Sequence, residues 1–277
     1  MASNINVSFE QQWSAEVKQA YQQETQKLRD CVRVQTGVVG ETYNFPVLDS
    51  IVANTKARGA ELTFIDADHN VVPATLEDAY APLLLDRLDE IKAKADYRRE
   101  YVQTTAKALA RKADDIVVAA LDAGVTSGSP ASGIITEVAA GAGTIFDSLL
   151  TAQRNLNSAD VPMNERCFVH APATLDLALR EAEFTSADFM MIKNLVAGEI
   201  DTALGFKWVL STRLTDGGGP RQNYAMHRRA AGLAIGQDVT SEVNYIPERV
   251  AHLATSMLSM GATIIDGPGV VRINVTE

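Results

Sequence analysis

Small and apolar residues recur every three or four positions from Leu88 onward, with one skipped place near Arg98. This spacing marks one face of an α-helix, and residues of high helix propensity fill most of the other positions. Neither Pro nor Gly interrupts the segment before Gly124, which stands where a C-cap glycine belongs. We predict a long spine helix over residues 88–121, with a core helix of an ordinary enzyme as the alternative. The positions on this face are Leu88, Ile91, Ala95, Val102, Ala106, Leu109, Ala113, Ile116 and Ala120.

The N-terminal residues carry a second helical pattern. Phe9, Trp13 and Val17 follow one another at helical spacing, and the apolar row continues beyond them. This predicts an amphipathic helix over residues 9–32, with Ser8 as its N-cap. Because a single helix gains most of its stability from packing, we expect it to dock on its own subunit or on a neighbouring one.

Behind this helix the pattern changes to the β type. Tyr43, Phe45 and Val47 alternate with Thr, Asn and Pro, and a second β-type run covers residues 61–65. Together these runs predict an extended two-stranded hairpin whose tip lies around residues 53–59. Because a long hairpin is marginally stable alone, we expect it to lie on a neighbouring subunit.

The rest of the chain mixes helical and strand patterns. Residues 75–78 resemble a capping box that leads into the spine helix. Residues 125–143 are rich in Gly, Ser and Ala and predict a flexible boundary between two parts of the subunit. The later predictions are helices over residues 144–157 and 172–182, strands over 166–170, 205–211, 239–245 and 270–275, a loop tip at 216–220, and a strand or helix over 252–265.

Composition and charge narrow the class of protein. A hydrophobic fraction of 46% and a charged fraction of 22% are typical of a soluble globular protein. The formal net charge of −10 argues against non-specific binding of nucleic acid, because phosphate contacts need clustered Lys and Arg. No apolar run is long enough for a transmembrane helix, and the first residues lack the pattern of a secretory signal. Cys31 and Cys167 form no paired motif and are predicted to be reduced thiols.

Motifs that carry chemistry are missing from the sequence. The four histidines share no two-histidine motif and stand near no cysteine pair, so no metal site is predicted. There is no Gly-x-Ser-x-Gly elbow, and the Gly-rich residues 139–144 lack the Lys of a phosphate loop. Asp114 and Asp115 are predicted to be a solvated or subunit-facing pair rather than a catalytic dyad. The sequence therefore predicts no catalytic residue, cofactor or metal, and a protein that is not an enzyme.

The order of these parts is similar to that of tailed-bacteriophage major capsid proteins, whose shell fold is named after phage Hong Kong 97. Residues 160–172 resemble the family's segment in which a strand ends in Pro and leads into a helix. Residues 196–200, followed by 204–211, resemble its segment in which a Gly precedes a Gly-Phe strand. Residues 225–234 and 259–266 resemble its last segments.

The resemblance implies an α+β phage capsid fold built from four parts. Residues 1–36 would form an N-terminal arm, and residues 37–80 an extended hairpin loop. Residues 81–129 and 236–277 would form a peripheral domain that contains the spine helix, and residues 130–235 an axial domain. The arm and the loop would reach over neighbouring subunits, and the subunit-interface residues expected from them are Phe9, Trp13, Val17, Tyr43, Phe45 and Phe64.

The resemblance also implies a function, namely self-assembly into the icosahedral head shell that encloses the genome of a tailed double-stranded DNA bacteriophage. The expected partners are other copies in pentamers and hexamers, scaffold, portal and cement proteins, and packaged DNA held without specific binding; no membrane is involved. The expected location is the virion, with the host cytoplasm during assembly. Two alternatives stay open, an encapsulin-like nanocompartment shell and a soluble α/β enzyme.

Overall fold

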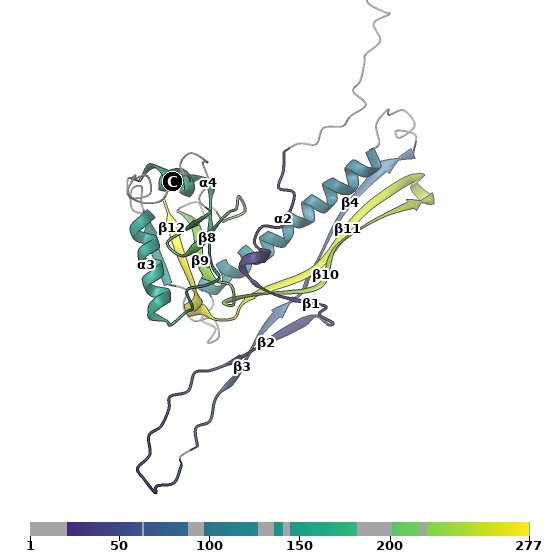
Figure 1. Cartoon of the computed structure of the whole chain (residues 1–277). Coiled ribbons are helices and arrows are strands. Elements are labelled where there is room, and N and C mark those ends of the chain that lie inside the picture. Colours follow the sequence, from purple (N-terminus) through teal and green to yellow (C-terminus); the bar gives the residue numbers. More distant parts are fainter. Residues whose placement is uncertain are drawn as a thin grey trace, which may run out of the picture.

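The computed structural model describes residues 21–62, 64–87, 97–126, 136–140, 145–181, 201–215 and 220–276. The subunit is elongated, with a helix lying along a long sheet, a second sheet with its own helices at one end, and a hairpin that projects from between them (Figure 1). None of the described helices is both long and apolar enough to cross a membrane.

A four-stranded sheet and one long helix form the first half of the subunit. The strand order is β1 (Arg33–Thr36), β10 (Ala231–Ile246), β11 (Ala251–Ile264) and β4 (Glu77–Asp86). Strand β11 runs antiparallel to both β10 and β4, and β1 is parallel to β10. The segment predicted as strand or helix over residues 252–265 is thus a strand. The short turn η3 (Pro247–Arg249) joins β10 to β11.

Helix α2 (Tyr97–Thr126) lies along this sheet and is the predicted spine (Figure 1). Its buried side chains include Leu109, Ala113 and Ile116 from the predicted face. Residues 88–96 of the prediction lie outside the described residues. The helix runs past Gly124, so the predicted C-cap is wrong: the cost of about 1 kcal/mol for a helical Gly does not stop a helix that is packed on a sheet.

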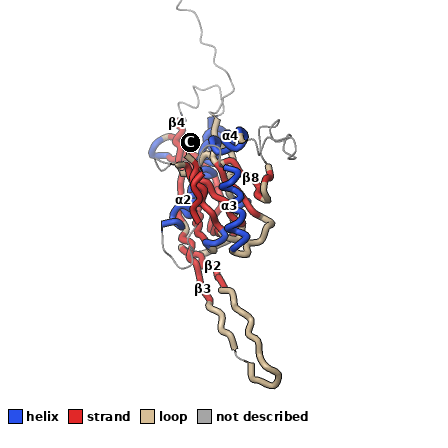
Figure 2. The backbone as a smooth tube through the Cα atoms, turned by 90° about the vertical axis from the view of Figure 1, so that its left-hand side faces the viewer, coloured by secondary structure: helices blue, strands red, loops and turns tan. Residues whose placement is uncertain are grey.

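A six-stranded sheet forms the second half. Its order is β5 (Thr136–Ala140), β12 (Val270–Val275), β9 (Arg221–His227), β6 (Arg166–His170), β8 (Phe206–Leu210) and β7 (Thr202–Ala203). Helices α3 (Ile145–Ser158) and α4 (Pro172–Arg180) belong to the same half of the subunit as this sheet (Figure 2). Both helices and strands β6, β8 and β12 agree with the sequence predictions, whereas the predicted loop tip at 216–220 lies mostly outside the described residues.

The last strand joins a different half from the one predicted. Strand β12 lies between β5 and β9 in the six-stranded sheet, whereas the resemblance implies that residues 236–277 as a whole belong with the spine helix. Its partner β5 falls inside the stretch predicted to be a flexible boundary. The two corrections have one cause: each strand is stabilised by a partner far away in the sequence, which local composition does not reveal. The turn η4 (Gly267–Gly269) carries the chain from one sheet to the other.

The hairpin projects from the junction of the two halves (Figures 1 and 2). Strands β2 (Thr42–Leu48) and β3 (His69–Thr75) pair antiparallel, from Thr42 opposite Thr75 to Leu48 opposite His69. The second strand is therefore not at residues 61–65 as predicted. Residues 75–78 do not cap a helix either, because β3 passes directly into β4 through Leu76, whose N–H donates to the Glu41 carbonyl at 2.8 Å.

The predicted N-terminal helix is wrong where it can be compared. Residues 21–28 form no helix, and one 3₁₀ turn, η2 (Arg29–Cys31), leads into β1. Leu28, Cys31 and Val32 are buried in the main core, together with Leu109, Leu121 and other side chains of α2 and both sheets. Residues 1–20, which carry Phe9, Trp13 and Val17, lie outside the described residues.

Candidate functional site

The extended loop between β2 and β3 exposes large apolar side chains. Residues 49–68 form no helix or strand in the part that is described, and the loop stands clear of the rest of the subunit (Figure 2). Phe64 is 95% exposed and Val52 is 82% exposed, and Ile51 and Leu62 are also largely in solvent. Exposed apolar surface of this kind, on a segment without a core of its own, is typical of a surface that contacts another molecule.

The interface residues that we predicted within the hairpin differ in how exposed the structure leaves them. Phe64 lies on the loop, and Tyr43 is half-buried at its base. Phe45 is fully buried in a small core with Ala234 and Ile265, so its ring has no surface to offer to a neighbour. Phe45 instead fixes the base of the hairpin on the four-stranded sheet. Its ring packs edge-on against Tyr43 at 4.8 Å, and the guanidinium of Arg33 lies 5.7 Å from its centre.

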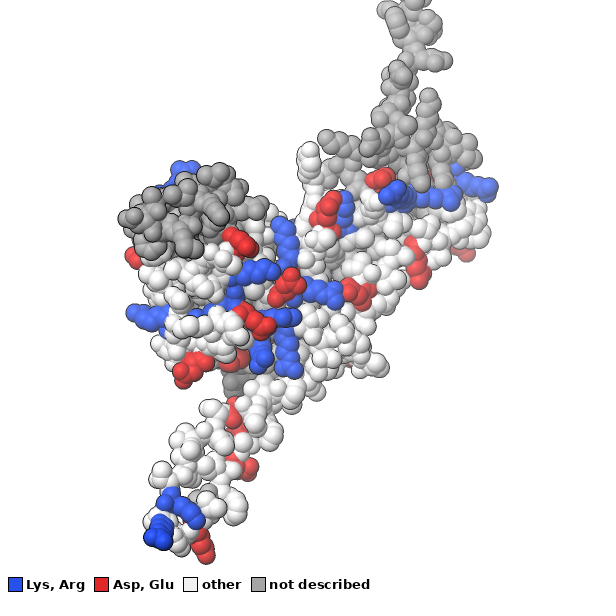
Figure 3. Space-filling view, in the orientation of Figure 1, with Lys and Arg blue, Asp and Glu red and all other residues white. Residues whose placement is uncertain are grey.

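Charge is distributed unevenly along the loop. Lys56 and Arg58 lie near the tip, where Figure 3 shows an acidic side chain next to the basic ones, and further Asp and Glu side chains lie nearer to the body of the subunit. The ammonium group of Lys56 donates a hydrogen bond to the Ala60 carbonyl at 3.0 Å, which helps to close the tip. The loop therefore presents an end of mixed charge and apolar, partly acidic sides to whatever it contacts.

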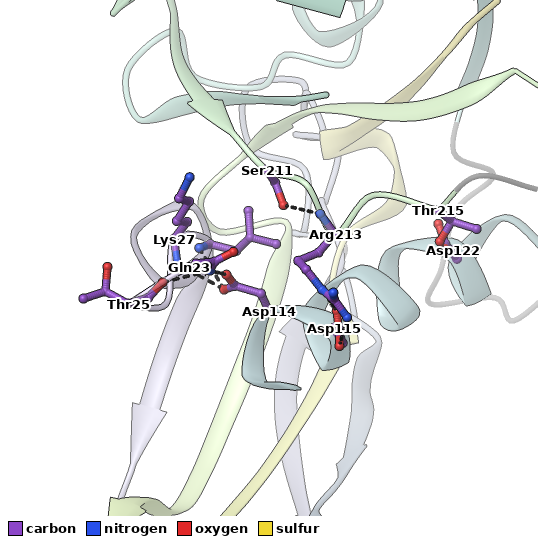
Figure 4. A network of polar contacts seen from close by, with 10 residues as sticks. Gln23, Thr25, Lys27, Asp114, Asp115, Asp122, Ser211, Arg213 and Thr215 are labelled. Atoms are coloured by element: carbon purple, nitrogen blue, oxygen red, sulfur yellow. Dashed lines mark hydrogen bonds and ion pairs between the residues drawn. The ribbon is translucent and has the colours of Figure 1, made fainter. Parts of the chain in front are cut away.

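Asp114 holds the N-terminal segment against the spine helix (Figure 4). Its carboxylate accepts hydrogen bonds from the backbone N–H of Lys27 at 3.1 Å and of Leu28 at 3.1 Å, and from the side-chain amide of Gln23. Burial raises the pKa of Asp114 above its ordinary value, and the two backbone hydrogen bonds oppose that rise. The prediction of a solvated or subunit-facing side chain is therefore wrong for Asp114, because partners from another segment bury it.

Two further aspartates of the spine hold the loop that follows β8. The guanidinium of Arg213 donates two hydrogen bonds of 2.6 Å to Asp115, one to each carboxylate oxygen, and this pairing raises the pKa of Arg213 (Figure 4). Asp122 accepts hydrogen bonds from the hydroxyls of Thr215 and Tyr224. Burial, followed by the bond to Asp122, raises the pKa of Tyr224.

The contacts of Asp115 and Asp122 form a joint between the spine helix and the second half of the subunit, whereas Asp114 fixes the N-terminal segment on the same helix. All three aspartates accept hydrogen bonds, and those of Asp115 and Asp122 suit a mechanical role in fixing how the two sheets are oriented. Among the described residues, no group of three or more His, Cys, Asp or Glu side chains could hold a metal ion.

One sequence signal could have located the contact of Asp114. Ala110, Asp114, Val117 and Leu121 follow one another at steps of three or four residues, and all four are buried. A carboxylate inside a buried helical row indicates a partner that supplies hydrogen-bond donors. No comparable signal marks Arg213 or Thr215, because they lie 98 and 93 residues away from their partners on the spine.

His170 is buried at the end of β6, next to the joint. Its ring lies 5.1 Å from that of Trp208 and 5.7 Å from that of Phe168, and its Nδ1 donates a hydrogen bond to the Ala171 carbonyl at 3.1 Å. Burial lowers the pKa of His170 to about 4. The imidazole is therefore neutral in the folded protein at neutral pH.

We expect the free energy of unfolding to fall as the pH decreases from 6.5 to about 4. In this window the unfolded chain protonates His170 while the folded subunit excludes the proton, so stability is present above pH 6.5 and is lost below it, by up to about 3 kcal/mol. Urea unfolding of the His170→Asn variant, whose amide can still donate to the Ala171 carbonyl, should lack this component. An unchanged pH profile would contradict the assignment. Asp114 acts in the opposite sense, because its raised pKa favours folding as the pH falls toward 3.8.

Comparisons with known proteins agree with this architecture. A family model described as phage capsid protein matches residues 5–277. A solved chain from Mycobacterium phage Che8 is 20% identical with a TM-score of 0.77, and the match covers 99% of this chain and 98% of that one. The capsid structure of cyanophage P-SCSP1u is 15% identical with a TM-score of 0.83, covering 100% and 96% of the two chains. The mature capsid of bacteriophage PhiM1 is 12% identical with a TM-score of 0.77, covering 97% and 92%. No curated protein sequence matches the chain.

Proposed function

The chain belongs to the phage capsid protein family and is a major capsid protein that forms the head shell, and from this premise we propose how its copies fit together. The extended loop of each subunit lies on a neighbour and buries its apolar side chains there. Copies form pentamers and hexamers and close into a shell around the double-stranded DNA genome of a tailed bacteriophage. The observation that carries this proposal is the exposed apolar loop, which has no core within its own subunit.

The two halves of the subunit take different places in the shell. We propose that the spine helix and the four-stranded sheet form the peripheral domain, and that the six-stranded sheet with α3 and α4 forms the axial domain near the five-fold and six-fold axes. The division follows the sheets, so that β12 belongs with the axial domain. The joint at Asp115 and Asp122 then keeps the two domains in a fixed relation.

The remaining partners are also proposals. Assembly takes place in the host cytoplasm, with scaffold, portal and cement proteins as further partners, and the protein has no catalytic activity. An acidic subunit with a net charge of −10 suits a container whose wall does not grip the packaged DNA.

Electron microscopy of the purified protein tests the proposed function directly. We expect closed icosahedral particles, and virions that contain DNA within the same shell. An encapsulin-like nanocompartment is the second candidate, since it would form closed particles that hold a co-purifying enzyme instead of DNA. Protein that stays monomeric under all conditions would contradict both.

The loop contact predicts an assembly defect for Phe64→Ala. Burying a large apolar side chain is worth about 1.5–3 kcal/mol per copy, so we expect the protein concentration needed for particle formation to rise about tenfold or more. The melting temperature of the isolated subunit should stay unchanged, because Phe64 is 95% exposed.

Phe45→Ala is the matched control for that variant. Truncating a buried Phe costs about 3–5 kcal/mol, so this variant should lower the melting temperature of the subunit itself. Light scattering measures assembly and circular dichroism measures unfolding. Particle formation by Phe64→Ala at the wild-type concentration would rule out a neighbour contact at this position.

The N-terminal arm is the other proposed contact between subunits, through Phe9, Trp13 and Val17. Deletion of residues 1–20 leaves the segment bound to Asp114 in place, so we expect a folded, soluble subunit that fails to close into particles. Deletion of residues 1–32 also removes the buried Leu28, Cys31 and Val32, so that protein should aggregate. Size-exclusion chromatography separates the outcomes, and intact particles after the shorter deletion would contradict the proposal for the arm.

A further inference from the structure

Three arginines surround a hollow where the two halves of the subunit meet. Arg33 lies in β1 at the edge of the four-stranded sheet, and Arg228 and Arg229 belong to the turn between β9 and β10. Together with Val34 and Glu165 they line a hollow of about 460 Å³. Figure 3 shows basic side chains gathered at the junction of the two halves, with acidic ones among them. The hollow is a locally positive surface on a chain whose net charge is −10.

The guanidinium groups of the hollow have fewer carboxylate partners than they could bind. The guanidinium of Arg228 lies 3.5 Å from the carboxylate of Glu165, and that of Arg33 lies 5.7 Å from the centre of the Phe45 ring. Arg33 and Arg229 are both exposed, and neither forms an ion pair with any residue that the structure describes. Three positive charges therefore share one negative charge, which leaves N–H donors for an incoming anion.

The extended loop carries the opposite charge. Residues 49–68 contain four acidic and two basic residues, which gives the loop a net charge of −2. Glu61, Asp66 and Asp68 are exposed, and among the described residues none of the three has an ion-pair partner. They flank the exposed Phe64, while Val34 adds apolar surface to the hollow. Loop and hollow are thus complementary in charge.

The loop is directed away from the hollow of its own subunit. Arg33 of the hollow contacts Phe45 in β2, and Phe45 pairs with Val72 in β3. Asp66 precedes Val72 by six residues, which is about 20 Å in an extended chain. The hairpin carries the loop outward, clear of the body of the subunit (Figures 1 and 2). Complementary surfaces that do not meet within one subunit indicate a contact between two copies.

We propose that the hollow formed by Arg33, Arg228 and Arg229 receives the acidic leg of the extended loop, residues 61–68, from a second copy of this chain. This rests on the proposed function, which puts the loop on a neighbour but names no receiving surface. A guanidinium can donate two parallel hydrogen bonds to one carboxylate. The ion pairs therefore fix where the loop lies, while its apolar side chains supply most of the buried surface.

The contact joins two different surfaces, the loop of one copy and the hollow of the next. A pair of copies joined in this way still has one free loop and one free hollow. Further copies add in the same direction until the rotation between neighbours closes a ring. Pentamers and hexamers are rings of this kind, so the charges set the direction in which the copies follow one another.

Charge reversal on each side tests the contact. The hollow variant carries Arg33→Glu and Arg229→Glu, and the loop variant carries Asp66→Lys and Asp68→Lys. Because like charges then face each other, each variant should need a protein concentration at least about tenfold higher to form particles. The protein with all four substitutions should assemble near the wild-type concentration. Arg249→Glu reverses a charge in the exposed turn η3, outside the hollow, and should assemble normally.

A peptide measurement examines the hollow without particle formation. A labelled synthetic peptide with the sequence of residues 59–70 should bind the isolated wild-type subunit at low salt. Fluorescence anisotropy should show affinity about tenfold weaker for the hollow variant, and also for the peptide with Asp66→Asn and Asp68→Asn. Added salt should weaken the binding, because exposed charges are screened. Circular dichroism checks that each variant is folded, and the loop variant alters only exposed side chains.

The outcomes separate this contact from the shell function. Assembly by the four substitutions together, with peptide binding that depends on the hollow, would support the proposal. A folded hollow variant that assembles and binds the peptide as the wild type does would overturn it. So would a DNA duplex that binds the wild-type subunit but not the hollow variant, while the peptide binds neither, since the hollow would then be a phosphate site. Absent wild-type particles contradict the shell function, and the peptide measurement still decides on the hollow.

Discussion

A single added methyl group at Gly261 is expected to prevent the subunit from folding. Gly261 is buried in strand β11, where the chain passes from β3 into β4 directly above it. A Cβ atom there would lie 2.1 Å from the carbonyl oxygen of Thr75 and 3.1 Å from the Cα of Leu76. Both contacts are with backbone, which cannot rotate away as a side chain can. We expect Gly261→Ala to cost more than about 4 kcal/mol and to yield insoluble protein.

Gly236→Ala is the matched control for this variant. Gly236 belongs to the neighbouring strand β10, and its nearest contact for a Cβ is the end of the Leu76 side chain at 2.7 Å. That side chain can move to another rotamer, so Gly236→Ala should remain soluble and form particles. Soluble expression and the melting temperature measure both variants. A soluble Gly261→Ala subunit with a wild-type melting temperature would show that strand β11 does not approach the backbone of Thr75 and Leu76 so closely.

The second large effect is expected for Ala106→Pro in the middle of the spine helix. Ala106 lies well inside α2, which runs from Tyr97 to Thr126. Proline removes a hydrogen-bond donor and its ring clashes with the preceding turn, at a cost of about 3 kcal/mol or more. The helix would kink where it lies on the four-stranded sheet, and every copy in a shell would carry the same distortion. We expect aggregated or unassembled protein.

Ala106→Gly separates the effect of helix propensity from that of the kink. This variant keeps the backbone donor and should cost only about 1 kcal/mol, so that particles still form with a modest drop in melting temperature. Electron microscopy and thermal unfolding give the comparison. Normal particles from Ala106→Pro would mean that a break at this position is tolerated in the assembled shell.

The spine helix and the short elements around it could be predicted because their signals are local. The apolar period that includes Leu109, Ala113 and Ile116 depends on residues three or four apart, and such residues lie on one face of the same helix. The strand patterns of β6, β8 and β12 depend on residues two apart. Each of these signals is complete within one segment, and the order of the segments was enough for the resemblance to phage capsid proteins.

Assignments that depend on distant partners could not be made in this way. Phe45 has the same alternating pattern whether it faces a neighbouring subunit or its own sheet, and only the packing of β2 on Ala234 and Ile265 buries it. The N-terminal segment has a helical period, yet Asp114 takes the backbone N–H groups of Lys27 and Leu28 as partners, and no helix forms there.

The sequence by itself therefore determined the family likeness, the spine helix and the extended hairpin, because short-range periodicity decides which segments become helices and strands. The tertiary structure alone decided that β12 lies in the six-stranded sheet, that Asp114 is buried and that Phe45 lies in the core of its own subunit. The physical reason is that sheet pairing and core packing select among many partners of similar local pattern. Which strands pair and which side chains pack together depends on the summed burial and hydrogen bonding of the whole subunit.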